Sequence, residues 1–121
     1  MEIKETAENY LETILMLSQN NERVRAVDIA KNLNCSKPTV SVAMKQFREN
    51  GYIKVNEDGH ITLTKKGKDI ASRMYERHNI IADALIKIGV DEKTAYKDAC
   101  KIEHDISDES FVKLKEHLKN I

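Results

Sequence analysis

The sequence predicts a mainly α-helical fold that contains one small β-hairpin. Apolar residues recur every three or four positions through most of the 121 residues, which is the spacing of amphipathic helices. The chain has four glycines and one proline, which are too few for a loop-rich fold. The segments 52–55 and 60–63 alternate like strands on either side of the short turn 56–59. A helical chain with one hairpin is therefore expected.

Two short helices before the hairpin are predicted from their caps. The first covers 27–33, and its inward residues are expected to be Val27, Ala30 and Leu33. Ser36 is the expected N-cap of the second helix, where Pro38 is tolerated in the first turn. Asn50-Gly51 ends this second helix. Two helices joined by a tight turn and followed by a two-stranded ribbon predict a winged helix-turn-helix.

The second of these helices carries polar and basic side chains outside its apolar stripe. Such residue types can reach phosphates and base edges. Lys54 in the wing is a further candidate, whereas Glu57 and Asp58 at the wing tip would be repelled by phosphates. The candidate DNA contacts are Ser36, Lys37, Pro38, Thr39, Ser41, Val42, Lys45 and Lys54. The alternative is an ordinary helical hairpin with a solvated basic face.

Four further helices complete the prediction. One covers 6–19 with Thr6 as its N-cap, and a long one covers 65–88 after the cap Thr64. Asp91 caps a helix that runs to about residue 105, and Ser107 caps the last one. The inward stripe of the long helix is expected to be Ile70, Met74, His78, Ile81, Leu85 and Ile88. Because a winged helix does not require so long a helix, part of it is expected to reach a dimer interface.

A metal-ligand pattern lies in the helix that follows Asp91. Cys100, Glu103 and His104 have the spacing i, i+3, i+4 and therefore share one face. A thiolate, a carboxylate and an imidazole at one place suit a divalent transition metal. The neighbouring stripe, which should pack against another element, is Ala95, Ala99, Ile102 and Ile106. The alternative is a solvated acidic face with one buried thiol.

Charge is unevenly distributed although the net charge is zero. Residues 21–78 have a net charge of +5, and the segments before and after them have −3 and −2. A basic middle segment is a modest indication that the protein binds a nucleic acid. No signal-peptide pattern and no apolar run long enough for a membrane span are present, so a cytoplasmic protein without membrane contact is expected. In that compartment the two cysteines are expected to be thiols.

The order of these motifs resembles the diphtheria-toxin-repressor and manganese-transport-regulator family of metal-dependent transcriptional repressors. The resemblance covers nearly the whole chain, and its most specific pieces are Asn9-Tyr10-Leu11-Glu12, Ser36-Lys37-Pro38-Thr39-Val40-Ser41, Leu63-Thr64-Lys65-Lys66-Gly67, Arg77-His78 and Cys100-Lys101-Ile102-Glu103-His104. It implies a DNA-binding domain over 1–72 and a helical metal-binding and dimerisation domain over 73–121. The metal ligands that it implies are Asn9, Glu12, His78, Cys100, Glu103 and His104.

The chain departs from the family pattern at several positions. Asn9 stands where other members have an acid or a methionine, and its amide oxygen is a weaker, neutral ligand. Cys100 stands where manganese-selective members have glutamate and iron-responsive members have cysteine. A thiolate favours Fe(II), Co(II), Ni(II) or Zn(II) over Mn(II) by ligand type, and Fe(II) is the metal expected here. The chain ends after its sixth predicted helix, so no C-terminal SH3-like domain is expected. Ala82 and Tyr96 stand where some relatives have an acid and a histidine that form an ancillary site, so one metal per subunit is expected.

The expected function is that of a metal-dependent transcriptional regulator, most simply a repressor of metal-uptake genes. It would bind a palindromic DNA operator as a homodimer when loaded with metal. Three alternatives stay open at this point. They are a winged-helix regulator switched by oxidation of Cys100 or by another ligand, a metal-dependent hydrolase, and a helical interaction module that does not contact DNA. The residues favour a regulator over an enzyme, because no substrate-cradling loop or nucleophile–base pair is evident.

Overall fold

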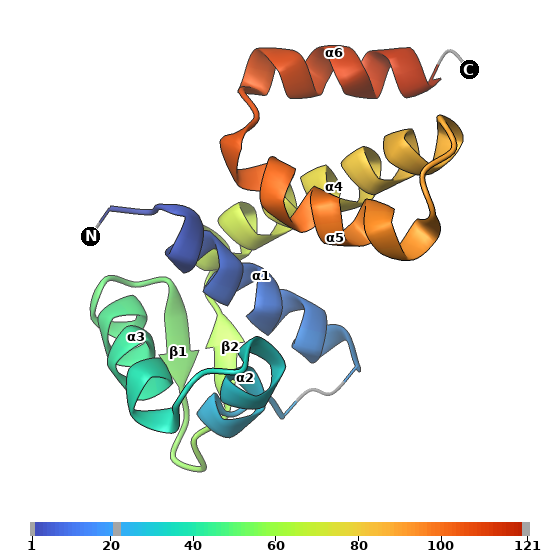
Figure 1. Ribbon diagram of the computed structural model, residues 1–121. Helices are drawn as coiled ribbons and strands as arrows, with labels where there is room; N and C mark the ends of the chain where they lie inside the picture. The colour runs from blue at the N-terminus through green and yellow to red at the C-terminus, as the bar shows by residue number, and fades with distance from the viewer. Residues whose placement is uncertain (1, 21–22, 120–121) are drawn as a thin grey trace. The chain divides into compact units, whose positions relative to one another are not determined.

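A computed structural model describes residues 2–20 and 23–119, which form helices and one small antiparallel sheet (Figure 1). The elements in chain order are α1 (Glu5–Asn20), α2 (Ala26–Leu33), α3 (Lys37–Glu49), β1 (Ile53–Val55), β2 (Ile61–Leu63), α4 (Lys65–Lys87), α5 (Glu92–Asp105) and α6 (Asp108–Lys119). The mainly α-helical class with a two-stranded wing is confirmed. The chain divides into two compact units, residues 1–72 and 73–121, and α4 contributes to both.

The pair α2 and α3 is joined by a turn that local chemistry explains. Asn34 ends α2 in the left-handed conformation, with φ at 54°, which asparagine tolerates better than most residues. The backbone N–H of Thr39 donates to the hydroxyl of Ser36 at 3.3 Å, so Ser36 is the N-cap of α3 as predicted. Pro38 lies in the first turn, where its missing N–H removes no helix bond.

The wing is a short hairpin held by its own turn. Ile53 pairs with Leu63, and Val55 pairs with Ile61. At the tip, the side-chain oxygen of Asn56 accepts from the backbone N–H groups of Asp58 and His60 at 3.0 and 2.9 Å. An asparagine turn of this kind fixes the register of the two strands.

The N-terminal unit has its core between α1, α2, α3 and the hairpin. Leu11, Ile14, Ile29 and Val40 are fully buried there. Phe47 of α3 lies between two tyrosines, with ring centroids 6.0 Å from Tyr10 and 6.2 Å from Tyr52, both in edge contact. These contacts fix α3 against α1, so the exposed face of α3 has a defined orientation within this unit.

The C-terminal unit consists of the second part of α4 with α5 and α6. Its small core contains Ile81, Ala82 and Ala99, with Leu85 and Leu114 partly buried against it. Asp91 and Ser107 cap α5 and α6 as predicted, each accepting from a backbone N–H three residues on. Among the described residues, no helix combines the length and the apolar character that crossing a bilayer requires.

Several local expectations are wrong. Thr6 is not the first N-cap, because α1 already begins at Glu5. Val27 is exposed, whereas Ile29, which was not among the predicted inward residues, is fully buried. Helix α2 also begins at Ala26, one residue earlier than predicted. Ile88 and Ile102 are also exposed. Helical periodicity gives the direction of a face, but it does not tell where the packed surface ends.

Gly67 in the first turn of α4 allows a close approach to the hairpin. A Cβ atom placed there would overlap the backbone carbonyl oxygen of Tyr52, which already accepts from the N–H of Thr64 at 3.1 Å. We expect Gly67→Ala to lower the free energy of unfolding by about 1–3 kcal/mol, because overpacking outweighs the better helix propensity of alanine. Urea denaturation measures this change in the free energy of unfolding. Lys68→Ala, an exposed neighbour, is the control and should stay within about 0.5 kcal/mol; equal stability of the two variants would contradict the prediction.

Candidate metal centre and nucleic-acid interface

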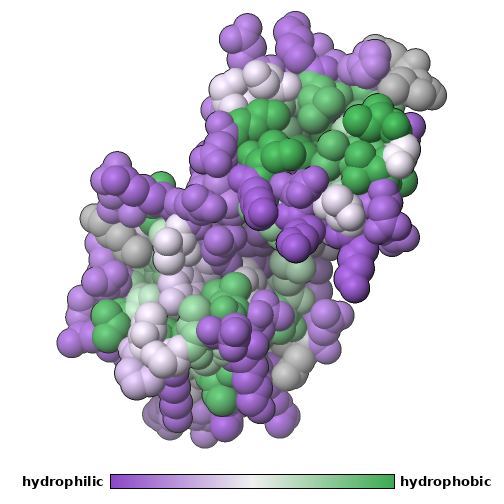
Figure 2. All heavy atoms as spheres, in the orientation of Figure 1, coloured by the Kyte–Doolittle hydropathy of each residue, from purple (hydrophilic) through white to green (hydrophobic). Residues whose placement is uncertain are grey.

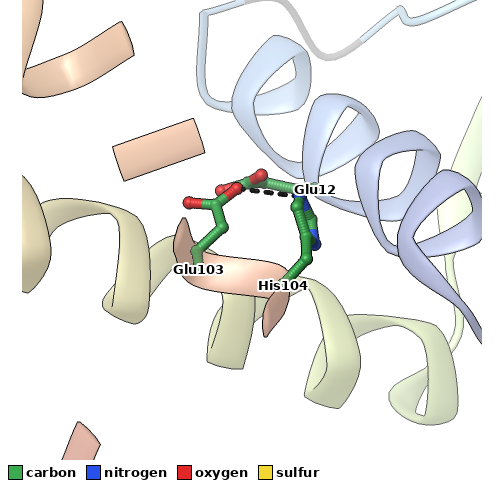
Figure 3. Close-up of side chains that lie close together, drawn as sticks. All are labelled: Glu12, Glu103 and His104. Carbon is green, nitrogen blue, oxygen red and sulfur yellow. Dashed lines mark ion pairs between the residues drawn. The ribbon is translucent and has the colours of Figure 1, made fainter. Parts of the chain in front are cut away.

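Glu103 of α5 is the centre of the candidate metal site. Its side chain is fully buried, with Oε2 at 3.0 Å from Nδ1 of His78 on α4 and Oε1 at 3.3 Å from Nε2 of His104. Figure 3 draws Glu103 and His104 on α5 together with Glu12 of α1. Within the described residues, Oε1 of Glu103 makes no hydrogen bond of normal geometry although it is buried. A buried carboxylate oxygen in this state is costly, and a bound cation would remove the cost.

Cys100 adds a sulfur donor to this group. Its Sγ atom lies 3.6 Å from Nδ1 of His78, and its residue is exposed. The Cys100 thiol, and after it the Glu103 carboxylate, raise the pKa of His78 to about 10 against the opposing effect of burial. His78 therefore carries a proton at neutral pH in the metal-free protein. Two imidazoles, a thiol and a carboxylate are a donor set that fits a divalent transition metal.

The packing of α4 on α5 explains why these side chains meet. Ala95 and Ala99 of α5 are buried and small, so the two helices can approach closely. On the α4 side, His78 lies in the buried stripe between Met74 and Ile81 as predicted. The ring of Tyr96 lies 5.5 Å from the ring of His78, at an angle of 40°. Glu103 therefore faces α4 and is not part of a solvated acidic face.

The six predicted ligands are divided between the two units. His78, Cys100, Glu103 and His104 belong to residues 73–121, and the structure brings them together there. Asn9 and Glu12 lie three residues apart on α1, in the N-terminal unit. Ala82 is fully buried, and its methyl group offers no ligand atom.

Arg77 is an important residue whose role the sequence prediction missed. Its side chain is buried beside the end of α5 and pairs with Asp108 at the start of α6. A signal was present, because position 77 follows Met74 by three residues and precedes Ile81 by four. That spacing puts it on the inward face of α4, where a charged side chain needs a partner.

The predicted DNA-contact residues all lie on exposed positions of the N-terminal unit. Those of α3 and its cap share the face opposite to Val40, Met44 and Phe47, and Lys54 is exposed on β1. The hydrophobic side chain of Val42 is 61% exposed. Beside α3, a groove of about 270 Å³ separates it from the hairpin and is lined in part by Lys45 and Arg48. Exposed lysines, hydroxyls and one apolar side chain on a helix are the groups that read a major groove.

Comparison with known proteins gives the family of the chain. Residues 2–61 match the model described as the iron dependent repressor N-terminal DNA binding domain. Residues 64–121 match the iron dependent repressor metal binding and dimerisation domain. The chain belongs to the iron-dependent repressor family. The resemblance stated from the sequence motifs is thereby confirmed.

Individual relatives agree with this family. An uncharacterized HTH-type transcriptional regulator of Methanocaldococcus jannaschii is 36% identical over 115 residues, which cover 93% of this chain and 92% of that protein. The HTH-type transcriptional regulator MntR of Lysinibacillus sphaericus is 33% identical over 100 residues, 83% of this chain and 72% of that one. The solved structure of the manganese regulator SloR has a TM-score of 0.80 at 28% identity and covers 98% of this chain. This chain spans 55% of SloR.

Membership in the iron-dependent repressor family bears on the alternatives left open by the sequence. Family members are transcription regulators rather than enzymes. Relatives of the chain are metal-dependent repressors. This relationship does not favour the alternative of a switch based on oxidation of Cys100. Relatives include both manganese and iron regulators, so a divalent metal is supported without a choice between the two.

Proposed function

We propose that this chain is a metal-responsive transcriptional repressor that binds operator DNA as a homodimer. The observation that carries the proposal is Glu103, a fully buried carboxylate between two imidazoles, in the unit that matches a metal-binding domain. The target genes that suit such a repressor are genes of metal uptake, because metal then limits its own import.

The proposed ligands within the C-terminal unit are His78, Cys100, Glu103 and His104. A bound divalent ion supplies positive charge to a place where a thiol and a carboxylate meet. Among the metals that this donor set can hold, the sulfur of Cys100 favours Fe(II), and Co(II), Ni(II), Zn(II) and Mn(II) are the competitors. His78 gives up its proton when it becomes a ligand, because a metal binds only the neutral imidazole.

Glu12 and Asn9 of α1 complete the proposed ligand set. They enter the proposal on the resemblance and on their chemistry: a carboxylate and an amide oxygen, three residues apart on one helix. Ligands from two units would favour one arrangement of the DNA-binding unit over the others. Without metal, the negative charges of Glu12 and Glu103 would repel each other.

The exposed face of α3 is the proposed reader of the major groove. Lys37 and Lys45 would contact phosphates, and Thr39, Ser41 and Val42, which are exposed on α3, would contact base edges. In a dimer, two such helices reach successive major grooves about 34 Å apart on one side of the duplex. Lys54 in the wing would add a backbone contact.

The proposed subunit interface lies on the C-terminal unit. In Figure 2, apolar side chains gather on its surface near α6 and the end of α4. The exposed large apolar residues of this unit include Ile86 and Ile88, in the last turn of α4 and just after it, and Val112 on α6. An exposed apolar patch on a small protein is commonly an interaction site, and this unit matches a dimerisation domain.

The experiment that tests the proposal measures DNA affinity with and without metal. Random 30-bp duplexes are first enriched on the Fe(II)-loaded protein under anaerobic conditions, and the selected duplex is then titrated by fluorescence anisotropy. We expect metal to raise the affinity by about 5- to 150-fold, the usual range of allosteric coupling. Mn(II), Co(II) and Zn(II) are compared at equal free concentrations. Equal binding with metal and with a chelator would contradict the proposal.

A charge-reversal variant separates the reading helix from the metal switch. Lys37→Glu with Lys45→Glu should weaken DNA binding by about 100-fold at moderate salt, because two phosphate contacts become repulsive. Its affinity for Co(II) should equal that of the parent protein, since both residues lie in the N-terminal unit away from His78 and Glu103 in the chain. The matched control is the same double charge reversal at two exposed lysines of α6, Lys113→Glu with Lys119→Glu. DNA affinity that survives the α3 change would overturn the assignment of α3 as the reader.

A further inference from the structure

A buried arginine directly precedes the proposed ligand His78. The side chain of Arg77 is 7% exposed, yet its guanidinium is well supplied with acceptors at one end. Its Nη1 atom donates to the backbone carbonyls of Glu103 at 3.3 Å and of Ile106 at 2.8 Å. Its Nη2 atom pairs with Oδ1 of Asp108. Burying a charge is costly, so a specific arrangement of acceptors is needed to retain it.

The two carbonyl acceptors of Arg77 lie at the end of α5, in Glu103 and in the C-cap residue Ile106. The last carbonyls of a helix have no partner within the helix and carry partial negative charge. A guanidinium suits them because its donors are fixed in one plane. One of the two bound carbonyls belongs to Glu103, the residue whose side chain lies 3.0 Å from His78. Arg77 therefore holds the backbone of one proposed ligand from the position next to another.

The same part of α4 also holds α6. Arg77 lies over the ring of Phe111, with Cζ at 5.3 Å from the centroid. Glu76 accepts from Nζ of Lys115 at 2.8 Å. Consecutive residues of α4 thus contact α6, the end of α5 and Glu103. A substitution that removes the contacts of Arg77 should therefore make both the end of α5 and the start of α6 more mobile.

We propose that Arg77 is a positioning residue of the metal centre, which sets the backbone of Glu103 relative to His78 before metal binds. This inference rests on the proposed function, because it takes Glu103 and His78 as ligands. It adds that the ligand geometry depends on a side chain that does not touch the metal. It also assigns the Asp108 pair a secondary role, since the Asp108 side chain is 85% exposed and the bonds to the carbonyls do not need it.

The test compares three substitutions in two measurements. The first is a titration with Co(II) that is monitored by the absorption spectrum of the bound ion, and the second is amide hydrogen exchange of the metal-free protein. Arg77→Met keeps the length and removes the donors, and we expect a loss in Co(II) affinity of about 10- to 100-fold, as for residues that orient ligands. Arg77→Lys, which can bond one carbonyl, should recover part of that loss. Asp108→Asn should change the affinity by less than about threefold, because the carbonyl bonds stay. Exchange should become faster at the end of α5 and in the first turn of α6 in Arg77→Met.

Arg73→Met is the matched control, because Arg73 is an exposed arginine on the same helix, and it should bind Co(II) like the parent. Parental affinity in Arg77→Met would overturn the positioning role. If Arg77→Met does not fold, Arg77→Lys decides: parental affinity and an unchanged cobalt spectrum would overturn the role, and weakened binding with an altered spectrum would support it. A parent protein that does not bind Co(II) would contradict the proposed metal centre itself, which distinguishes that failure from a failure of Arg77 alone.

Discussion

Replacing Glu103 with glutamine is expected to reduce the affinity for Fe(II) or Co(II) by at least about 100-fold. Glutamine keeps the size of the side chain and one acceptor oxygen, but it removes the negative charge between His78 and His104. Residues that merely orient metal ligands contribute about 10- to 100-fold to affinity, so loss of a charged ligand should reach or exceed that range. Isothermal titration with Co(II) measures the difference.

Thermal or urea unfolding provides a second measure of the same loss. At a metal concentration about 100 times the parent dissociation constant, the parent gains about 2.7 kcal/mol in free energy of unfolding. A variant that binds 100-fold more weakly gains only about 0.4 kcal/mol under these conditions. Glu92→Gln, the same change at an exposed position of α5, is the control and should show the full gain. Equal stabilisation of Glu103→Gln and the control would show that Glu103 is not a ligand.

The parts of the fold that depend on residues close together in the sequence could be predicted from the sequence. The caps Ser36, Thr64, Asp91 and Ser107 are confirmed, since each accepts from a backbone N–H three residues on. A cap is a local interaction, and its residue type and spacing are visible in the chain. The outer ends of the apolar stripes could not be predicted in the same way. Ile88 fits the period of α4 but is 79% exposed.

The candidate site shows the same division between local and distant contacts. Helical spacing alone places Cys100, Glu103 and His104 on one face. The approach of His78 to Glu103 joins residues that are 25 positions apart, and only the family resemblance connected them beforehand. Arg77 was missed because a charged residue on a helix is usually solvated. Helical spacing did put Arg77 on the inward face of α4, but two of its acceptors are backbone carbonyls at the end of α5, which residue types do not reveal.

Metal affinity is expected to increase with pH, by about tenfold per pH unit for each proton that leaves on binding. The Cys100 thiol and then the Glu103 carboxylate raise the pKa of His78 to about 10, so this imidazole must lose a proton whenever it becomes a ligand below that pH. Between pH 6.5 and 8.5 the affinity for Co(II) should therefore rise by at least about 100-fold. Titrations in buffers with different heats of ionisation give the number of protons released.

The stability of the metal-free protein should change with pH in the opposite direction. The folded pKa of His78 lies above its unfolded value of 6.5, so its contribution to stability is fully present below pH 6.5. That contribution is lost as the pH rises through about 10. Cys100→Ala removes the larger cause of the raised pKa, and Cys35→Ala, at the other exposed thiol, is the control. The Cys100 variant should therefore show a smaller decrease in melting temperature between pH 7 and 9 than the control, and an identical decrease in both would contradict the assigned cause.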